Sequence, residues 1–158
     1  SGGVINGLLY VAGGSVNNTN GVATLEVYDP NTDTWTTKAS LPTARSSPGV
    51  AELGGILYVA GGRAGGSDAL TTVESYNPAT DTWTTEPSLP TARNAPVAVG
   101  LNGVLYVAGG NLVPGHESGD HTVDAFTPAI NVNIDITPGS ISYNGSAYAT
   151  SRPATATA

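Results

Sequence analysis

The chain has 158 residues, of which 39% are hydrophobic and 11% charged, with 21 glycines, 11 prolines and no cysteine. Its formal net charge of −7 argues against nucleic acid and anionic membrane surfaces as partners, because an acidic surface is repelled by both. The absence of cysteine excludes disulfides and thiolate metal sites, and no apolar run reaches the roughly 18 residues that span a bilayer. The many glycines and few charges are typical of short strands joined by tight turns. Since there is no initiator methionine, we expect a processed product or part of a longer protein.

A nine-residue motif recurs along the chain. It occurs, 48 residues apart each time, as NGLLYVAGG at 6–14, GGILYVAGG at 54–62 and NGVLYVAGG at 102–110. Trp35 and Trp83 keep the same spacing, as does Leu-Pro-Thr-Ala-Arg at 41–45 and 89–93. A period of this length with several fixed landmarks predicts stacked structural repeats.

The second repeat predicts four short strands. They cover residues 47–53, 56–60, 72–76 and 82–85. Gly54-Gly55 forms a two-residue hairpin turn between the first two, and Pro78 ends the third. The second strand, Ile-Leu-Tyr-Val-Ala, is apolar on both faces and must therefore be covered on both sides. Each repeat is thus expected to be a blade that lies between two others.

The glycine pair after an apolar strand, followed by Tyr76 and then Trp83, resembles the kelch repeat. The resemblance implies a β-propeller, used in most of the family to bind proteins or glycans and in a minority for catalysis. We therefore expect an all-β fold, a partial propeller of about three four-stranded antiparallel blades within residues 1–139. The expected blades cover residues 1–42, 43–90 and 91–139, and a Ser/Thr/Ala-rich tail or linker at 140–158 forms an extended C-terminal arm.

The first and third repeats depart from this pattern. Residues 1–5 cover only the end of the expected first strand. In the third repeat Phe126 replaces Tyr76 and the tryptophan is missing, but the alternation of apolar residues still predicts a strand over 131–136. That stretch also resembles a segment found towards the C-termini of secreted bacterial and archaeal proteins.

One loop of the third repeat has residues that could bind a metal. His116, Glu117, Asp120 and His121 offer two imidazoles and two carboxylates for a divalent ion. Nearby glycines disfavour the helix on which paired histidines form a metalloprotease site, so a solvated loop is the favoured interpretation, with no cofactor. The copper oxidases of the kelch family use a tyrosine cross-linked to cysteine, which this chain cannot form. We predict no catalytic residue.

Other repeated polar residues favour structural roles. Asp33 and Asp81 precede the tryptophans in turns, where a carboxylate accepts backbone N–H groups and stabilises the hairpin. Arg45 and Arg93 are expected to bridge neighbouring blades. The tyrosines of the nine-residue motif are expected to pack between blades: Tyr10, Tyr58 and Tyr106. Trp35 and Trp83 are likewise expected to pack against the sheet of a neighbouring blade.

The loops between the second and third strands differ from repeat to repeat and are the predicted ligand-binding surface. They cover residues 15–23, 63–70 and 111–122, and the candidate ligand-binding residues are Asn17, Asn18, Arg63, Asp68, His116, Glu117, Asp120 and His121. Asn17 and Asn144 begin glycosylation sequons. With the low charge and the lack of cysteine, these sequons favour an extracellular or cell-surface location.

Three functions remain open. The first is a non-enzymatic module that binds a protein or glycan through these loops and self-associates through open blade faces. The second is a structural subunit of a filament or surface assembly, and the third is a metal-dependent lectin or enzyme that uses the loop from His116 to His121. We expect a homo-oligomer or part of a longer propeller, because three blades do not close a ring. A second copy could complete a six-bladed ring, add head to tail, or supply residues 131–136 as an added strand in blade one.

Overall fold

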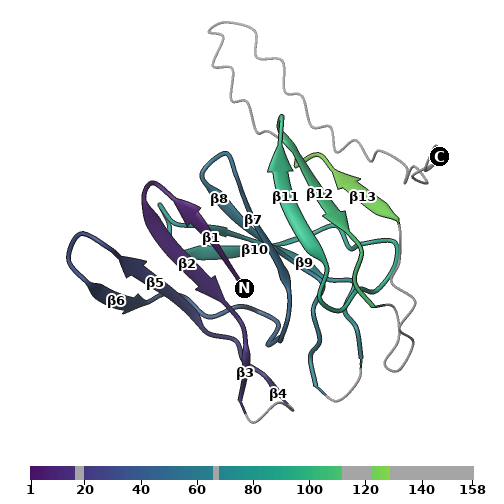
Figure 1. Ribbon diagram of the computed structural model, residues 1–158, viewed down its shortest axis with the longest axis horizontal. Coiled ribbons are helices and arrows are strands. Elements are labelled where there is room, and N and C mark those ends of the chain that lie inside the picture. Colours follow the sequence, from purple (N-terminus) through teal and green to yellow (C-terminus); the bar gives the residue numbers. More distant parts are fainter. Residues whose placement is uncertain (17–19, 66–67, 112–121, 129–158) are drawn as a thin grey trace, which may run out of the picture.

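The computed structural model describes residues 1–16, 20–65, 68–111 and 122–128. These residues form three twisted antiparallel sheets that stand side by side as blades, with one small hairpin at their edge (Figure 1). Blade 1 contains β1 (Gly2–Ile5), β2 (Leu8–Ala12), β5 (Leu25–Asp29) and β6 (Thr34–Thr37). Blade 2 contains β7 (Gly49–Leu53), β8 (Ile56–Ala60), β9 (Val73–Asn77) and β10 (Thr82–Glu86). Blade 3 contains β11 (Val97–Leu101), β12 (Val104–Ala108) and β13 (Val123–Phe126), and the small hairpin joins β3 (Ser15–Val16) to β4 (Asn20–Gly21).

The predicted all-β architecture is confirmed, and the four strands of blade 2 lie within two residues of their expected positions. The expectation that blade 1 lacks most of its first strand is wrong. Gly2–Ile5 pairs along its whole length with the strand that follows, from Gly2 opposite Val11 to Ile5 opposite Leu8. Asn6 and Gly7, both with positive φ, form a two-residue hairpin turn that joins this short strand directly to the next one. Blade 1 is therefore a complete sheet, and the hypothesis that a strand is added there has lost its basis.

Blade 3 has three strands among the described residues. The strand predicted over 131–136 and the tail at 140–158 lie outside them.

The core lies between the blades. Strand alternation gives every blade two apolar faces: an upstream face towards the preceding blade and a downstream face towards the following one. Leu57, Val59 and Tyr76 of blade 2 are fully buried against blade 1, while Tyr58 and Ala60 pack towards blade 3. Aromatic rings meet at both junctions, Tyr10 with Tyr76 and Tyr58 with Phe126. The two-sided apolar strand therefore has the covering that the sequence predicts.

Burial of the inter-blade tyrosines makes the fold sensitive to alkali. Burial, and to a lesser extent the Glu86 carboxylate, raises the pKa of Tyr58 from its ordinary value of 10 to about 12. Because the raised pKa belongs to the folded state, this contribution to stability is complete below pH 10 and is lost as the pH rises from 10 to about 12.

We therefore expect the melting temperature to fall through this pH range, and Tyr58→Phe to reduce the fall because it removes one ionisable phenol. Circular dichroism melts of both proteins would measure the difference. An identical alkaline loss in wild type and variant would contradict this account.

Candidate functional site

The loops between the second and third strands of the blades lie along one edge of the molecule (Figure 1). We call their described residues the loop rim: 15–16, 20–23, 63–65, 68–70 and 111. Neighbouring loops are joined by backbone contacts, since Asn20 pairs with Gly65 and Gly21 N–H donates to the carbonyl of Ala64 at 3.1 Å. The rim is thus one continuous surface across blades 1 and 2.

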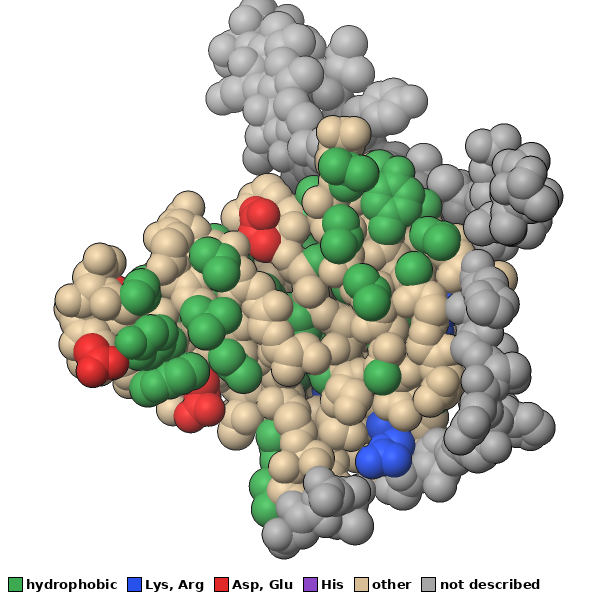
Figure 2. All heavy atoms as spheres, in the orientation of Figure 1, with side chains coloured by type: hydrophobic (Ala, Val, Ile, Leu, Met, Phe, Trp, Pro, Cys, Tyr) green, Lys and Arg blue, Asp and Glu red, His purple; other side chains and the backbone are tan. Residues whose placement is uncertain are grey.

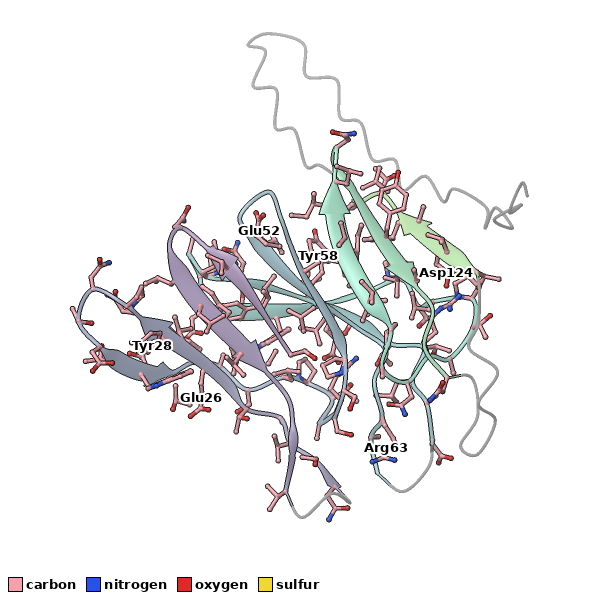
Figure 3. All side chains as sticks on the ribbon, in the orientation of Figure 1. Glu26, Tyr28, Glu52, Tyr58, Arg63 and Asp124 are labelled. Carbon is pink, nitrogen blue, oxygen red and sulfur yellow. The ribbon has the colours of Figure 1, made fainter. Side chains whose placement is uncertain are left out.

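Two of the predicted ligand-binding residues lie on this rim. The backbone N–H and C=O of Arg63 both bond to Ser46, at 2.8 Å each, so the half-buried arginine starts from a fixed position (Figure 3). Asp68 lies exposed in the same loop. The other predicted binding, metal-ligating and glycosylation residues lie outside the described residues: Asn17, Asn18, His116, Glu117, Asp120, His121 and Asn144. Within the described ranges, no three His, Cys, Asp or Glu side chains come together as a possible metal site.

Arg45 bridges blades 1 and 2, as predicted. Its backbone N–H bonds to Val22 of blade 1, while its fully buried side chain reaches into blade 2. There the guanidinium pairs with Glu74 at 2.8 Å and donates to the carbonyls of Gly61 at 2.8 Å and Thr72 at 3.1 Å. Burial lowers the pKa of Arg45, and the Glu74 carboxylate opposes that shift. Arg45 therefore serves the fold and is not available to a ligand.

Arg93 repeats this arrangement between blades 2 and 3. It pairs with Asp124 at 2.9 Å, donates to the carbonyl of Gly109 at 2.7 Å and bonds to the Thr122 hydroxyl. Sequence reasoning identified both arginines but missed their acidic partners. The sequence did contain a signal for Glu74, because a glutamate stands at the same position of the first repeat, Glu26.

The repeated aspartates have a structural role, as predicted, but each carboxylate accepts a tyrosine hydroxyl, and the N–H groups expected from the turns bond to other side chains. Asp33 accepts the hydroxyl of Tyr28 at 2.8 Å, and Asp81 accepts that of Tyr76 at 2.6 Å. The turn N–H groups bond instead to Asp29 and Asn77, which end the preceding strands. The reason is geometric: Asp33 and Asp81 have φ near +54° and +53°, in turns that bring each carboxylate to the tyrosine of the paired strand.

Blade 2 also holds the segment that arrives from blade 1. Ala39 N–H donates to Asp81 at 3.0 Å, and the Trp83 indole N–H donates to the carbonyl of Ala39 at 2.8 Å. The hydrogen bonds from Tyr76 and Ala39 lower the pKa of Asp81. The prediction that both tryptophans pack on a neighbouring blade holds for Trp83 and is wrong for Trp35, which is 56% exposed.

The upstream face of blade 1 is apolar and partly exposed. Strand pairing places Val4, Leu9, Glu26, Tyr28 and Trp35 on this face. Leu9 is 36% exposed, whereas its equivalent in blade 2, Leu57, is fully buried. Figure 2 shows hydrophobic side chains gathered over this part of blade 1 with acidic side chains beside them, and Figure 3 shows Glu26 and Tyr28 on β5.

The family model for the Kelch motif matches residues 1–42 and 44–90, which together make up more than half of the chain. The chain belongs to the kelch repeat family. No curated protein matches the sequence significantly. In the part of the kelch chain that the structure describes, no helix is long and apolar enough to cross a membrane.

The first test concerns the buried ion pair. Arg45→Ala should cost about 3–5 kcal/mol of unfolding free energy, because it leaves the Glu74 carboxylate buried without its cation. Arg63→Ala on the rim, the matched control, should change stability by about 0.5 kcal/mol or less. Replacing both partners, Arg45→Met with Glu74→Leu, should recover most of the loss. Urea denaturation would measure all three, and equal costs for the two single arginine variants would contradict the bridging role.

The second test compares the two tryptophans. Trp83→Ala should cost about 3 kcal/mol, because it removes an inter-blade side chain and its hydrogen bond. The same substitution at Trp35, measured at a concentration at which the protein is monomeric, should cost less than about 1 kcal/mol, because more than half of that side chain is then in water. Equilibrium denaturation can rank them, and a Trp35 variant as unstable as the Trp83 variant would show that this face is covered in solution.

Proposed function

We propose that this chain is a non-enzymatic interaction module that binds a protein or a glycan through the loop rim. Kelch repeats generally mediate protein–protein interactions. The observation that carries the proposal is the contrast between the blade interiors and the rim. The nine-residue motif is almost unchanged from blade to blade, whereas SVNNTNGVA at 15–23 and RAGGSDAL at 63–70 have no common pattern. Loops that differ on a repeated scaffold are where binding specificity is commonly found.

A second candidate function is structural: a subunit that assembles through its end blades. It is supported by the distribution of exposed apolar side chains. Apart from Val16 on the rim, every large exposed hydrophobic residue among those described lies on one of the two end faces. Val4, Leu9 and Trp35 lie on the upstream face of blade 1, and Val97, Val99 and Leu101 on the downstream face of blade 3. Apolar faces of this kind commonly mark an interface.

We also propose an extracellular or cell-surface location. The supporting features are in the sequence: no cysteine, few charges and two glycosylation sequons, at Asn17 and Asn144.

The rim proposal predicts that a charge exchange, Arg63→Glu with Asp68→Lys, abolishes partner binding and leaves the melting temperature unchanged. Partners would be captured on immobilised protein and identified by mass spectrometry, and each would be remeasured with purified components. Asn31→Glu, on the exposed β5–β6 turn, is the matched control because it changes charge away from the rim. We expect at least about a tenfold loss of affinity for the exchange variant alone. Partners that bind all three proteins equally would refute the rim as the binding surface.

A further inference from the structure

The junction between blades 1 and 2 shows how a blade recognises the segment in front of it. The segment Ala39 to Arg45 crosses from one blade to the next. The Thr43 hydroxyl donates to one oxygen of Glu74 at 2.6 Å, and the Arg45 guanidinium pairs with the other at 2.8 Å. Leu41, between these anchors and Ala39, is buried in the core of the junction. The recognised element is therefore a buried apolar side chain followed by Thr-x-Arg.

Blade 1 carries the same acceptor on its exposed upstream face. Glu26 stands where Glu74 stands in blade 2, on the same strand position and the same face. The carbonyls that Arg45 uses in blade 2 also have counterparts. Gly13 N–H donates to Thr24 O at 2.9 Å, just as Gly61 N–H donates to Thr72 O at 2.9 Å, so the backbone is already in the binding conformation. Glu26 is exposed, whereas Glu74 is only 2% exposed.

The second half of the recognition surface is also in place. Asp33 and Trp35 correspond to Asp81 and Trp83, which hold the two backbone groups of Ala39. The Trp35 ring already lies tilted against Tyr28, with ring centroids 5.1 Å apart, as the Trp83 ring does against Tyr76 at 5.2 Å. The upstream face of blade 1 thus has the Glu26 acceptor for Thr-x-Arg at one end. At the other end it has Asp33 and Trp35, the equivalents of the pair that binds the backbone of Ala39; we call such a pair the clamp.

The chain contains a third segment of the recognised type. Three of its four arginines follow a threonine by two residues, in the segments ASLPTAR at 39–45, PSLPTAR at 87–93 and SAYATSR at 146–152. The first two fill the interior junctions. The third lies outside the described residues, and its Tyr148 stands where the other two have the buried leucines Leu41 and Leu89.

We propose that the upstream face of blade 1 binds residues 146–152 of a second copy of this chain, with Arg152 on Glu26. A second copy is favoured because blade 1 and blade 3 lie at opposite ends of the row (Figure 1), and because blade 3 exposes Val97, Val99 and Leu101 on the face that would meet blade 1. The contact is then head to tail and repeats the junction that the chain uses twice internally. This inference rests on the proposed assembly through end blades.

The test uses the full chain in sedimentation equilibrium at micromolar concentrations. Wild type should associate, and Glu26→Gln and Arg152→Gln should each weaken association at least about tenfold, because each removes one partner of a charge pair. Glu26→Asp should associate as wild type does, since Asp124 serves in this position in blade 3. Arg63→Gln, an arginine without the preceding threonine, is the control and should have no effect. Melting curves would confirm that the variants remain folded.

A peptide of residues 146–152 provides a direct measurement. Added to the Arg152→Gln chain, it should shift the tryptophan emission to shorter wavelength as Trp35 becomes buried. The shift should be absent in a Trp35→Phe variant of that chain and with a peptide in which Arg152 is replaced by Gln. A wild-type chain that stays monomeric would overturn both this inference and the assembly proposal. Association that survives both Glu26→Gln and Arg152→Gln would overturn this inference alone.

Discussion

Both junctions between the three described blades are built around an arginine buried between two blades. Removing a guanidinium from water costs several kcal/mol, and the cost is offset only where a carboxylate and backbone carbonyls meet it with good geometry. Arg45 obtains these groups from Glu74, Gly61 and Thr72, all in the blade that follows it. The glycine pairs are needed for the same reason, because the backbone of an arginine packs directly against them. A Cβ on Gly61 would lie 2.6 Å from the carbonyl of Arg93, so the chain can approach there only without a side chain.

The hydrogen-bonded clamp on the linker is the part that varies. In blade 2, Asp81 and Trp83 hold the N–H and the carbonyl of Ala39. At the next junction Pro87 replaces Ala39 and has no N–H to donate, and Phe126 replaces Tyr76 and has no hydroxyl. A small pocket lies there between the linker and blade 3, lined in part by Pro87, Leu89 and Phe126. The arginine is kept at both junctions, so it, and not the clamp, sets the register between blades.

The sequence predicts the features that recur in each repeat, and it misses those that depend on contacts with a neighbouring blade. The 48-residue period was sufficient to predict the strands of blade 2 and the bridging role of Arg45, because local pattern and turn chemistry decide them. The repeat did not predict the environment of Trp35, which has the same flanking residues as Trp83 but is 56% exposed on a face that no other described blade covers. The acidic partners were missed because Glu74 and Asp124 differ in type and lie far along the chain from the arginines that they bind.

The upstream face of blade 1 combines an apolar surface with one carboxylate, and the two contribute different things. Burying side chains such as Leu9 and Trp35 would favour association at about 25 cal/mol per Å², but apolar contact alone discriminates poorly between partners. Glu26 adds the discrimination, because covering it without a cation would leave a charge buried and unpaired. A partner must therefore bring an arginine at the right distance from an apolar side chain. With this requirement, the exposed blade face binds selectively, whereas an apolar face alone would bind many partners.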